Sequence, residues 1–162
     1  MKIIINYRLD LVSNNTLKFV DVEIPKSIEK CRNKDEFLLF FCGKIYKICE
    51  DCQIYKNVQI MAPYLERPVR IKYMIVLPSD EGLILDASLK IQEIRKKTKE
   101  LSDYFELAIE QNKSDINIVY AILLTKINPK RELAYELENE YRVKIMTLDD
   151  AIKFVKRRLE KW

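Results

Sequence analysis

The feature that most constrains the fold is an almost continuous apolar run from Ile116 to Ile127. A strand that is apolar at nearly every position, rather than at alternate positions, is typical of a strand covered on both faces. We therefore predict that this run is the central strand of a sheet with flanking helices. The chain has 162 residues and 48% apolar content, which suffices for one sizeable core, so we expect a single α/β domain over residues 1–162.

Helices and strands alternate after the central strand. Asn128 and Pro129 predict a helix start, with asparagine as the N-cap and proline at the first helical position. Val143–Met146 predicts a short strand, and Thr147 with Asp150 resembles a capping box that opens a final helix. A strand, helix, strand succession of this length implies parallel strands joined by a right-handed crossover.

An antiparallel hairpin and a long helix are predicted before the central strand. Val69–Leu77 and Leu83–Ile91 are rich in β-forming residues, and Pro78–Gly82 between them has turn chemistry. From Ile91 to Ala108 the apolar residues recur at helical spacing, which predicts a helix of about five turns with basic residues on its other side.

The first quarter of the chain predicts an N-terminal β-hairpin in residues 1–25. Its strands are Ile3–Val12 and Leu17–Ile24, and Ser13–Thr16 has the composition of the loop between them. Pro25 ends the second strand. The outer strand of such a hairpin is an exposed edge at which another chain could pair.

The main core is predicted over residues 27–162. Ser27–Cys42 predicts a helix, with Gly43 as its C-terminal stop. Lys44–Ile48 alternates polar and apolar residues and predicts a strand, and Asn57–Met61 predicts another short strand.

This order of helix, strand, hairpin, long helix, buried strand, helix and short strand is similar to the restriction-endonuclease-like fold of PD-(D/E)xK nucleases and Holliday-junction resolvases. The resemblance covers Ser27–Leu159. In that family the third core strand carries an acid-x-Lys motif before the long helix, and an earlier aspartate lies on the preceding strand. The two acids hold Mg²⁺ or Mn²⁺, which polarises the phosphate and activates a water, while the lysine stabilises charge.

The resemblance implies a candidate catalytic pair, Asp86 and Lys90. Asp86 takes the position of the acid, but Ser88 stands where the family has lysine, and Lys90 lies one repeat further along the strand. The preceding stretch Arg70–Tyr73 contains no acid. The resemblance therefore implies either a degenerate relative that binds nucleic acid or an active nuclease whose catalytic groups have migrated, for example to the long helix.

Positive charge is concentrated on two predicted helices, although the net charge of the chain is only +4. Basic helices can contact the phosphates of DNA or RNA, and the alternative is an ordinary solvated face. The candidate nucleic-acid-binding residues are Arg95, Lys96, Lys97, Lys99, Lys156, Arg157 and Arg158.

The four cysteines lie close together in the sequence, and the last two form a CxxC. They are Cys31, Cys42, Cys49 and Cys52. Thiolates at such spacings are candidate ligands for Zn²⁺, and the alternatives are burial as small apolar side chains or a disulfide. The chain has no histidine and two glycines, which excludes histidine-based metal sites, Ser-His catalysis and a glycine-rich phosphate loop.

The function predicted from these features is that of a nuclease-like, nucleic-acid-binding protein that has lost catalysis. The alternatives are an adaptor subunit with a protein partner or a second copy of the chain, and an active metal-dependent endonuclease. No apolar run reaches about 18 residues and no signal peptide is recognisable, so we expect a cytoplasmic protein without a membrane partner. Abundant Lys, Glu, Ile and Tyr resemble thermophile usage.

Overall fold

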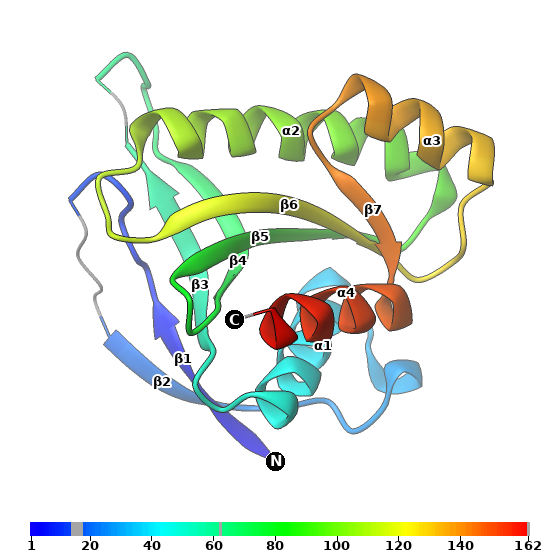
Figure 1. The fold of residues 1–162 in the computed structure, drawn as a ribbon, viewed down its shortest axis with the longest axis horizontal. Coiled ribbons are helices and arrows are strands. Elements are labelled where there is room, and N and C mark those ends of the chain that lie inside the picture. Colours follow the sequence, from blue (N-terminus) through cyan, green and yellow to red (C-terminus); the bar gives the residue numbers. More distant parts are fainter. Residues whose placement is uncertain (14–17, 62, 162) are drawn as a thin grey trace.

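One mixed sheet of seven strands organises the computed structural model, which describes residues 1–13, 18–61 and 63–161 (Figure 1). The strand order is β2-β1-β3-β4-β5-β6-β7. The predicted α/β class, with an N-terminal strand pair beside a mixed sheet, is confirmed. The strands are β1 (Lys2–Tyr7), β2 (Lys18–Glu23), β3 (Gln53–Ile60), β4 (Val69–Val76), β5 (Glu81–Ser88), β6 (Asn117–Thr125) and β7 (Lys144–Thr147).

Four α-helices cover the two faces of the sheet. Helices α1 and α4 contribute to one hydrophobic core cluster, and α2 and α3 contribute to the other, so the sheet separates two cores. None of the described helices is long and apolar enough to span a membrane. The helices are α1 (Lys34–Ile48), α2 (Ile94–Gln111), α3 (Arg131–Glu140) and α4 (Leu148–Glu160), with short 3-10 turns at Ile28–Lys30 and Ile91–Glu93.

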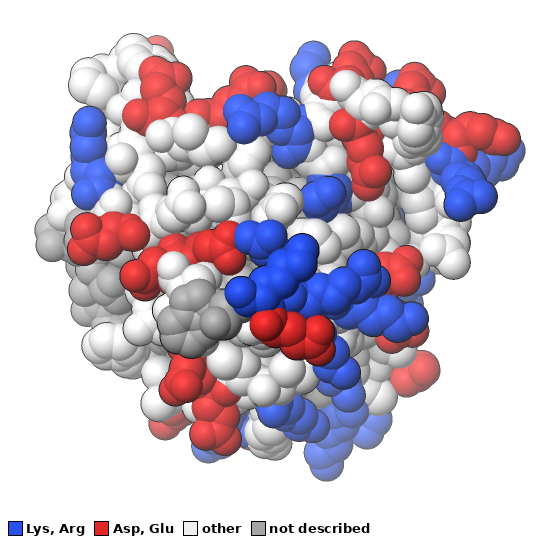
Figure 2. Space-filling view, in the orientation of Figure 1, with Lys and Arg blue, Asp and Glu red and all other residues white. Residues whose placement is uncertain are grey.

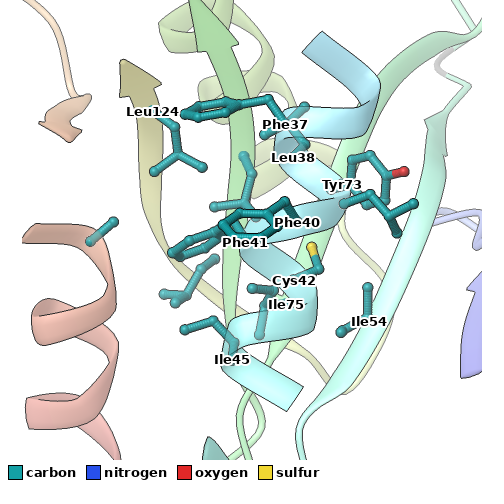
Figure 3. Close-up of a cluster of buried hydrophobic side chains, with 14 of the residues drawn as sticks. Phe37, Leu38, Phe40, Phe41, Cys42, Ile45, Ile54, Tyr73, Ile75 and Leu124 are labelled. Carbon is teal, nitrogen blue, oxygen red and sulfur yellow. The ribbon is translucent and has the colours of Figure 1, made fainter. Parts of the chain in front are cut away.

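Helix α1 is buried along most of its length. Asn33 caps its N-terminus by accepting a hydrogen bond from the Glu36 amide at 2.9 Å, which satisfies one of the free amides of the first turn. Its apolar side chains pack against β3, β4 and β6, as Figure 3 shows. Burial on several sides explains why a run with strand character forms a helix. The packed side chains are Phe37, Leu38, Phe41, Cys42, Ile45, Ile54, Tyr73, Ile75 and Leu124.

Two predictions about this region are wrong, because the helix runs through Gly43 and includes Lys44–Ile48. Gly43 does not stop the helix. A Cβ at this position would lie 2.7 Å from Cγ2 of Ile24, so glycine is required by the close approach of the chain after β2. The alternation that suggested a strand is also compatible with a helix, in which Ile45 is buried and Lys47 is exposed. The predicted start at Ser27 is likewise wrong, because α1 begins at Lys34.

The N-terminal strand pair is confirmed, with β1 antiparallel to β2 and Ile3 opposite Val22. The first strand is shorter than predicted, since β1 ends at Tyr7. Most of the predicted loop, residues 14–16, lies outside the described residues. Beyond the pair, β1 lies parallel to β3, so the N-terminal strands extend the same sheet rather than forming a separate unit.

The elements after β3 follow the prediction closely. The β4–β5 hairpin is antiparallel, and its turn contains Asp80 at φ 69°. Strand β6 lies between β5 and β7 and is parallel to both, so it is an internal strand as expected, but it is next to the edge of the sheet rather than at its centre. Thr147 accepts a hydrogen bond from the Asp150 amide at 3.5 Å, as a capping box requires.

Two boundaries differ from the prediction. Strand β3 begins at Gln53, earlier than the predicted Asn57. Helix α3 begins at Arg131 with Lys130 as its N-cap residue. Asn128 and Pro129, predicted as the N-cap and the first helical residue, therefore lie in the loop before the helix.

We predict that Gly43→Ala lowers the free energy of unfolding by about 1–3 kcal/mol, because the added methyl group overpacks the contact with Ile24. This loss should exceed the helix-propensity gain of at most about 1 kcal/mol. In an Ile24→Ala background the clash is gone, so the same substitution should raise the free energy of unfolding. Urea unfolding followed by circular dichroism measures both, and an equal loss in both backgrounds would contradict the explanation.

Candidate functional site

Asp86 lies near the carboxyl end of β5 and is buried, with 6% of its surface exposed. Alternate residues of a strand share a face, so Asp86 lies on the same side as Ile84, which belongs to the core cluster under α2. The Asp86 carboxylate accepts a hydrogen bond from the Ala87 amide at 2.7 Å. A buried carboxylate also requires a positive partner to offset its lost hydration.

Lys34 supplies that positive partner. Its Nζ atom lies 3.5 Å from Oδ1 of Asp86, and both side chains are largely withdrawn from solvent. Lys34 is the first residue of α1, and the Asn33 cap fixes its position. Sequence reasoning did not find this residue, because the partner expected for Asp86 was a lysine on the same strand.

Two further lysines lie close to Lys34 and complete what we call the Asp86 cluster: Lys34, Lys72, Asp86 and Lys97. Lys97 comes from α2 and forms an ion pair with Glu100 at 3.8 Å. Lys72 comes from β4, where the next residue pairs with the residue before Asp86 on β5. The cluster therefore brings lysines from β4 and α2 close enough to Lys34 of α1 for their charges to act on it, and Lys34 forms an ion pair with the buried carboxylate.

The electrostatics of the cluster are dominated by the burial of Lys34 and by its attraction to Asp86, and repulsion from the other lysines is a smaller effect. Burial lowers the pKa of Lys34, and the charges of Lys97 and Lys72 lower it further, while the carboxylate of Asp86 opposes the shift. Burial also raises the pKa of Tyr104, and the nearby carboxylates of Glu100 and Asp86 add to that increase. The charge of Asp86 therefore acts on a residue of α2, Tyr104.

The residues around Asp86 do not fit a divalent cation. Mg²⁺ and Mn²⁺ need several oxygen ligands and a negative environment. Within 1–13, 18–61 and 63–161, the structure contains no group of three or more His, Cys, Asp or Glu side chains able to hold a metal. On β4, beside Asp86, the chain has Lys72 where the resemblance implies an acid. Three ammonium groups would repel the cation.

Lys90, the second predicted catalytic residue, lies beyond the strand. Strand β5 ends at Ser88, so the alternation that would place Lys90 beside Asp86 stops before reaching it. The Ser88 hydroxyl donates a hydrogen bond to the backbone oxygen of Lys90 at 2.8 Å, and Lys90 itself is exposed. The cation next to Asp86 thus comes from α1 rather than from β5.

The basic residues of α2 separate into different environments. Arg95 forms an exposed ion pair with Glu136 of α3 at 3.2 Å. Lys96 and Lys99 are exposed to solvent. Of the four predicted residues on this helix, Lys97 alone joins the Asp86 cluster.

The basic residues of α4 form a second positive surface. Figure 2 shows Lys and Arg side chains gathered over this helix. Lys156 and Arg157 are exposed. Arg158 makes contacts within the protein: it forms an ion pair with Glu81 at the start of β5 and lies over the ring of Tyr120.

The four cysteines are free thiols, and the structure gives the predicted zinc site no support. Cys42 is buried within α1, and Cys49 and Cys52 lie in the turn between α1 and β3. Burial raises the pKa of the thiols of Cys31, Cys42 and Cys52, which disfavours the thiolate form that binds metals. Cys31, Cys42 and Cys52 are small buried side chains, and Cys49 is half-buried.

The comparisons with known proteins bear on the fold. No family model matches the chain, and no curated protein is similar to it in sequence. Among solved structures, protein VC1899 from Vibrio cholerae is similar, with a TM-score of 0.53 and 14% sequence identity. The similarity covers 88% of this chain and 37% of the length of VC1899. At this identity it shows a shared fold alone.

We predict that the Lys34 amine titrates below its ordinary pKa of 10.5, and that Asp86→Asn lowers its pKa further by removing the carboxylate that stabilises the ammonium form. NMR titration of lysine Cε resonances measures both, with the Lys34 signal assigned by its loss in Lys34→Arg. An unchanged Lys34 titration in Asp86→Asn would show that the ion pair does not exist in solution.

Proposed function

We propose that this protein binds nucleic acid at the Asp86 cluster, which contacts the phosphate backbone of the nucleic acid. We further propose that it does not cleave the nucleic acid by metal-dependent hydrolysis. The observation that carries the proposal is the ion pair of Lys34 with the buried Asp86, together with the charges of Lys72 and Lys97, which lie near enough to act on Lys34. Such an excess of positive charge attracts phosphate and disfavours a divalent cation.

The order of elements supports a degenerate nuclease-like protein. The succession α1, β3, β4, β5, α2, β6, α3 and β7 is the order on which the resemblance to PD-(D/E)xK nucleases rests. Asp86 lies on the third strand of that succession, before the long helix. No acid lies on β4 near Asp86, where the chain has Lys72, and Ser88 stands at the position of the expected lysine. We therefore propose binding of nucleic acid without catalysis.

The geometry of the cluster suits a phosphate group without sequence specificity. A lysine ammonium is a compact point charge that contacts phosphate oxygens from many directions. Asp86 holds Lys34 in place, so part of the charge is positioned before any ligand arrives. The exposed Lys96 and Lys99 on α2 extend the positive surface beyond the cluster.

We predict that Lys72→Ala and Lys97→Ala weaken the binding of a DNA or RNA duplex, while Lys113→Ala does not. Lys113 is an exposed lysine after the far end of α2 and is the matched control. Each lost phosphate contact should reduce the slope of log K against log salt by about 0.9. Fluorescence anisotropy over a range of salt concentrations measures these slopes, and Asp86→Asn should leave the affinity equal or higher.

Two outcomes would contradict this function. The first is the absence of any binding at low salt. The second is cleavage of the duplex in Mg²⁺ or Mn²⁺ that disappears in Asp86→Asn, which would establish the active endonuclease in place of the degenerate one. Both are tested with the same purified protein and the same labelled duplex.

A second candidate function, an adaptor that pairs with a second copy of the chain, is favoured by the edge strand β2. This strand has one neighbour in the sheet, β1, and its Phe19 side chain is 73% exposed. Exposed edge strands with apolar side chains favour pairing with another chain.

For the adaptor function, we predict a concentration-dependent dimer in sedimentation experiments that Phe19→Lys makes monomeric, because lysine on an edge strand opposes pairing. Tyr64→Lys, at another exposed aromatic residue, is the control and should leave the dimer intact. A wild-type chain that stays monomeric at all concentrations would exclude this candidate.

A further inference from the structure

A recess with a volume of about 400 Å³ lies beside the first half of β6. It exists because β7 is short. Strand β7 pairs with β6 only from Ile122 to Thr125, so before Ile122 the side of β6 that faces away from β5 has no neighbouring strand. Side chains from α2, α3 and the segment leading into β7 form the walls. The residues that line the recess include Phe105, Tyr120, Tyr135, Asn139, Arg142 and Lys144.

A buried ring, Phe105, and a half-buried ring, Tyr120, each lie beside a cation at this recess, which the Glu138 carboxylate also lines. The guanidinium of Arg142 lies 5.2 Å from the centre of the Phe105 ring, and the ammonium of Lys144 lies 5.6 Å from that of Tyr120. Tyr135 on α3 is 71% exposed, so its ring is available to a ligand. Such interleaving of aromatic and basic side chains suits single-stranded nucleic acid, whose bases stack on the rings while the cations contact phosphates.

We infer that the recess takes an unpaired nucleobase from a nucleic-acid strand whose phosphates contact the Asp86 cluster. This inference rests on the proposed function and adds the class of ligand to it. The volume is within the range of small-molecule sites, about 300–1,000 Å³, and Asn139 offers an amide for hydrogen bonds to the base edge.

The position of the recess is compatible with one strand reaching both sites. Lys97 of the Asp86 cluster and Phe105 of the recess lie eight residues apart on α2, which corresponds to about 12 Å along the helix axis. The ion pair between Arg95 and Glu136 joins the same helix to α3, the element that carries Tyr135. Helix α2 thus contributes a residue to both sites, and one surface ion pair links it to α3.

An extended peptide fits this recess less well. A peptide that adds a strand needs a run of free backbone groups, but the Ile145 amide of β7 already donates to Glu138 at 2.8 Å. Of β6, the part that lines the recess is the short segment from Val119 to Ala121. The cations Arg142 and Lys144 favour a polyanion over a neutral strand.

The test compares a fully paired duplex with the same duplex carrying one unpaired 2-aminopurine. We expect the wild-type protein to bind the second on the order of tenfold more tightly, with quenching of the 2-aminopurine fluorescence by stacking. Tyr135→Leu should abolish both the preference and the quenching and leave binding of the paired duplex unchanged. Tyr135→Phe keeps the ring and should retain both effects.

Tyr64→Leu, at a tyrosine that is 64% exposed and lies outside the recess, is the matched control and should behave as wild type. Failure of the inference and failure of the proposed function are distinguishable. If neither duplex binds at low salt, the proposed function is wrong and the inference with it. If both bind equally and Tyr135→Leu changes nothing, the inference alone is overturned.

Discussion

The ion pair between Lys34 and Asp86 is the constraint on which the arrangement of the site depends. It joins the first residue of α1 to the end of β5, and these elements are far apart in the sequence. Removing one partner from such a pair leaves a buried charge without compensation, which typically costs more than the pair itself contributes. Lys34 therefore cannot be replaced without consequences for Asp86, and the start of α1 is tied to the sheet at this point.

The fold after β3 could be predicted from local patterns, because those patterns agree with the tertiary structure. The apolar run around Ile122 forms an internal parallel strand, and Thr147 caps α4 as its spacing predicts. The prediction failed around Gly43, where the deciding interaction is a contact with Ile24 across the fold. A local rule assigned glycine to a helix end, whereas the packing of a distant residue requires it within the helix.

The site was predictable only in part for a similar reason. The β-rich pattern placed Asp86 correctly on the strand before the long helix, but the lysine expected beside it was on the same strand, which ends before Lys90. One signal in the sequence did point to Lys34. A lysine in the first turn of a helix faces the positive end of the helix dipole and is unfavourable there, so its presence after the N-cap Asn33 indicates a carboxylate partner elsewhere in the fold.

The Asp86 cluster stores electrostatic repulsion that a bound phosphate would relieve. Lys34 has a lowered pKa because it is buried and lies near Lys97 and Lys72. Under the proposed function, an anion among these three groups stabilises the ammonium form and raises the pKa of Lys34 again. By the same linkage, affinity falls as the pH rises through the lowered pKa of the free protein. A structural ion pair with no ligand has no such coupling, and this is the physical difference between a surviving binding site and a relic of one.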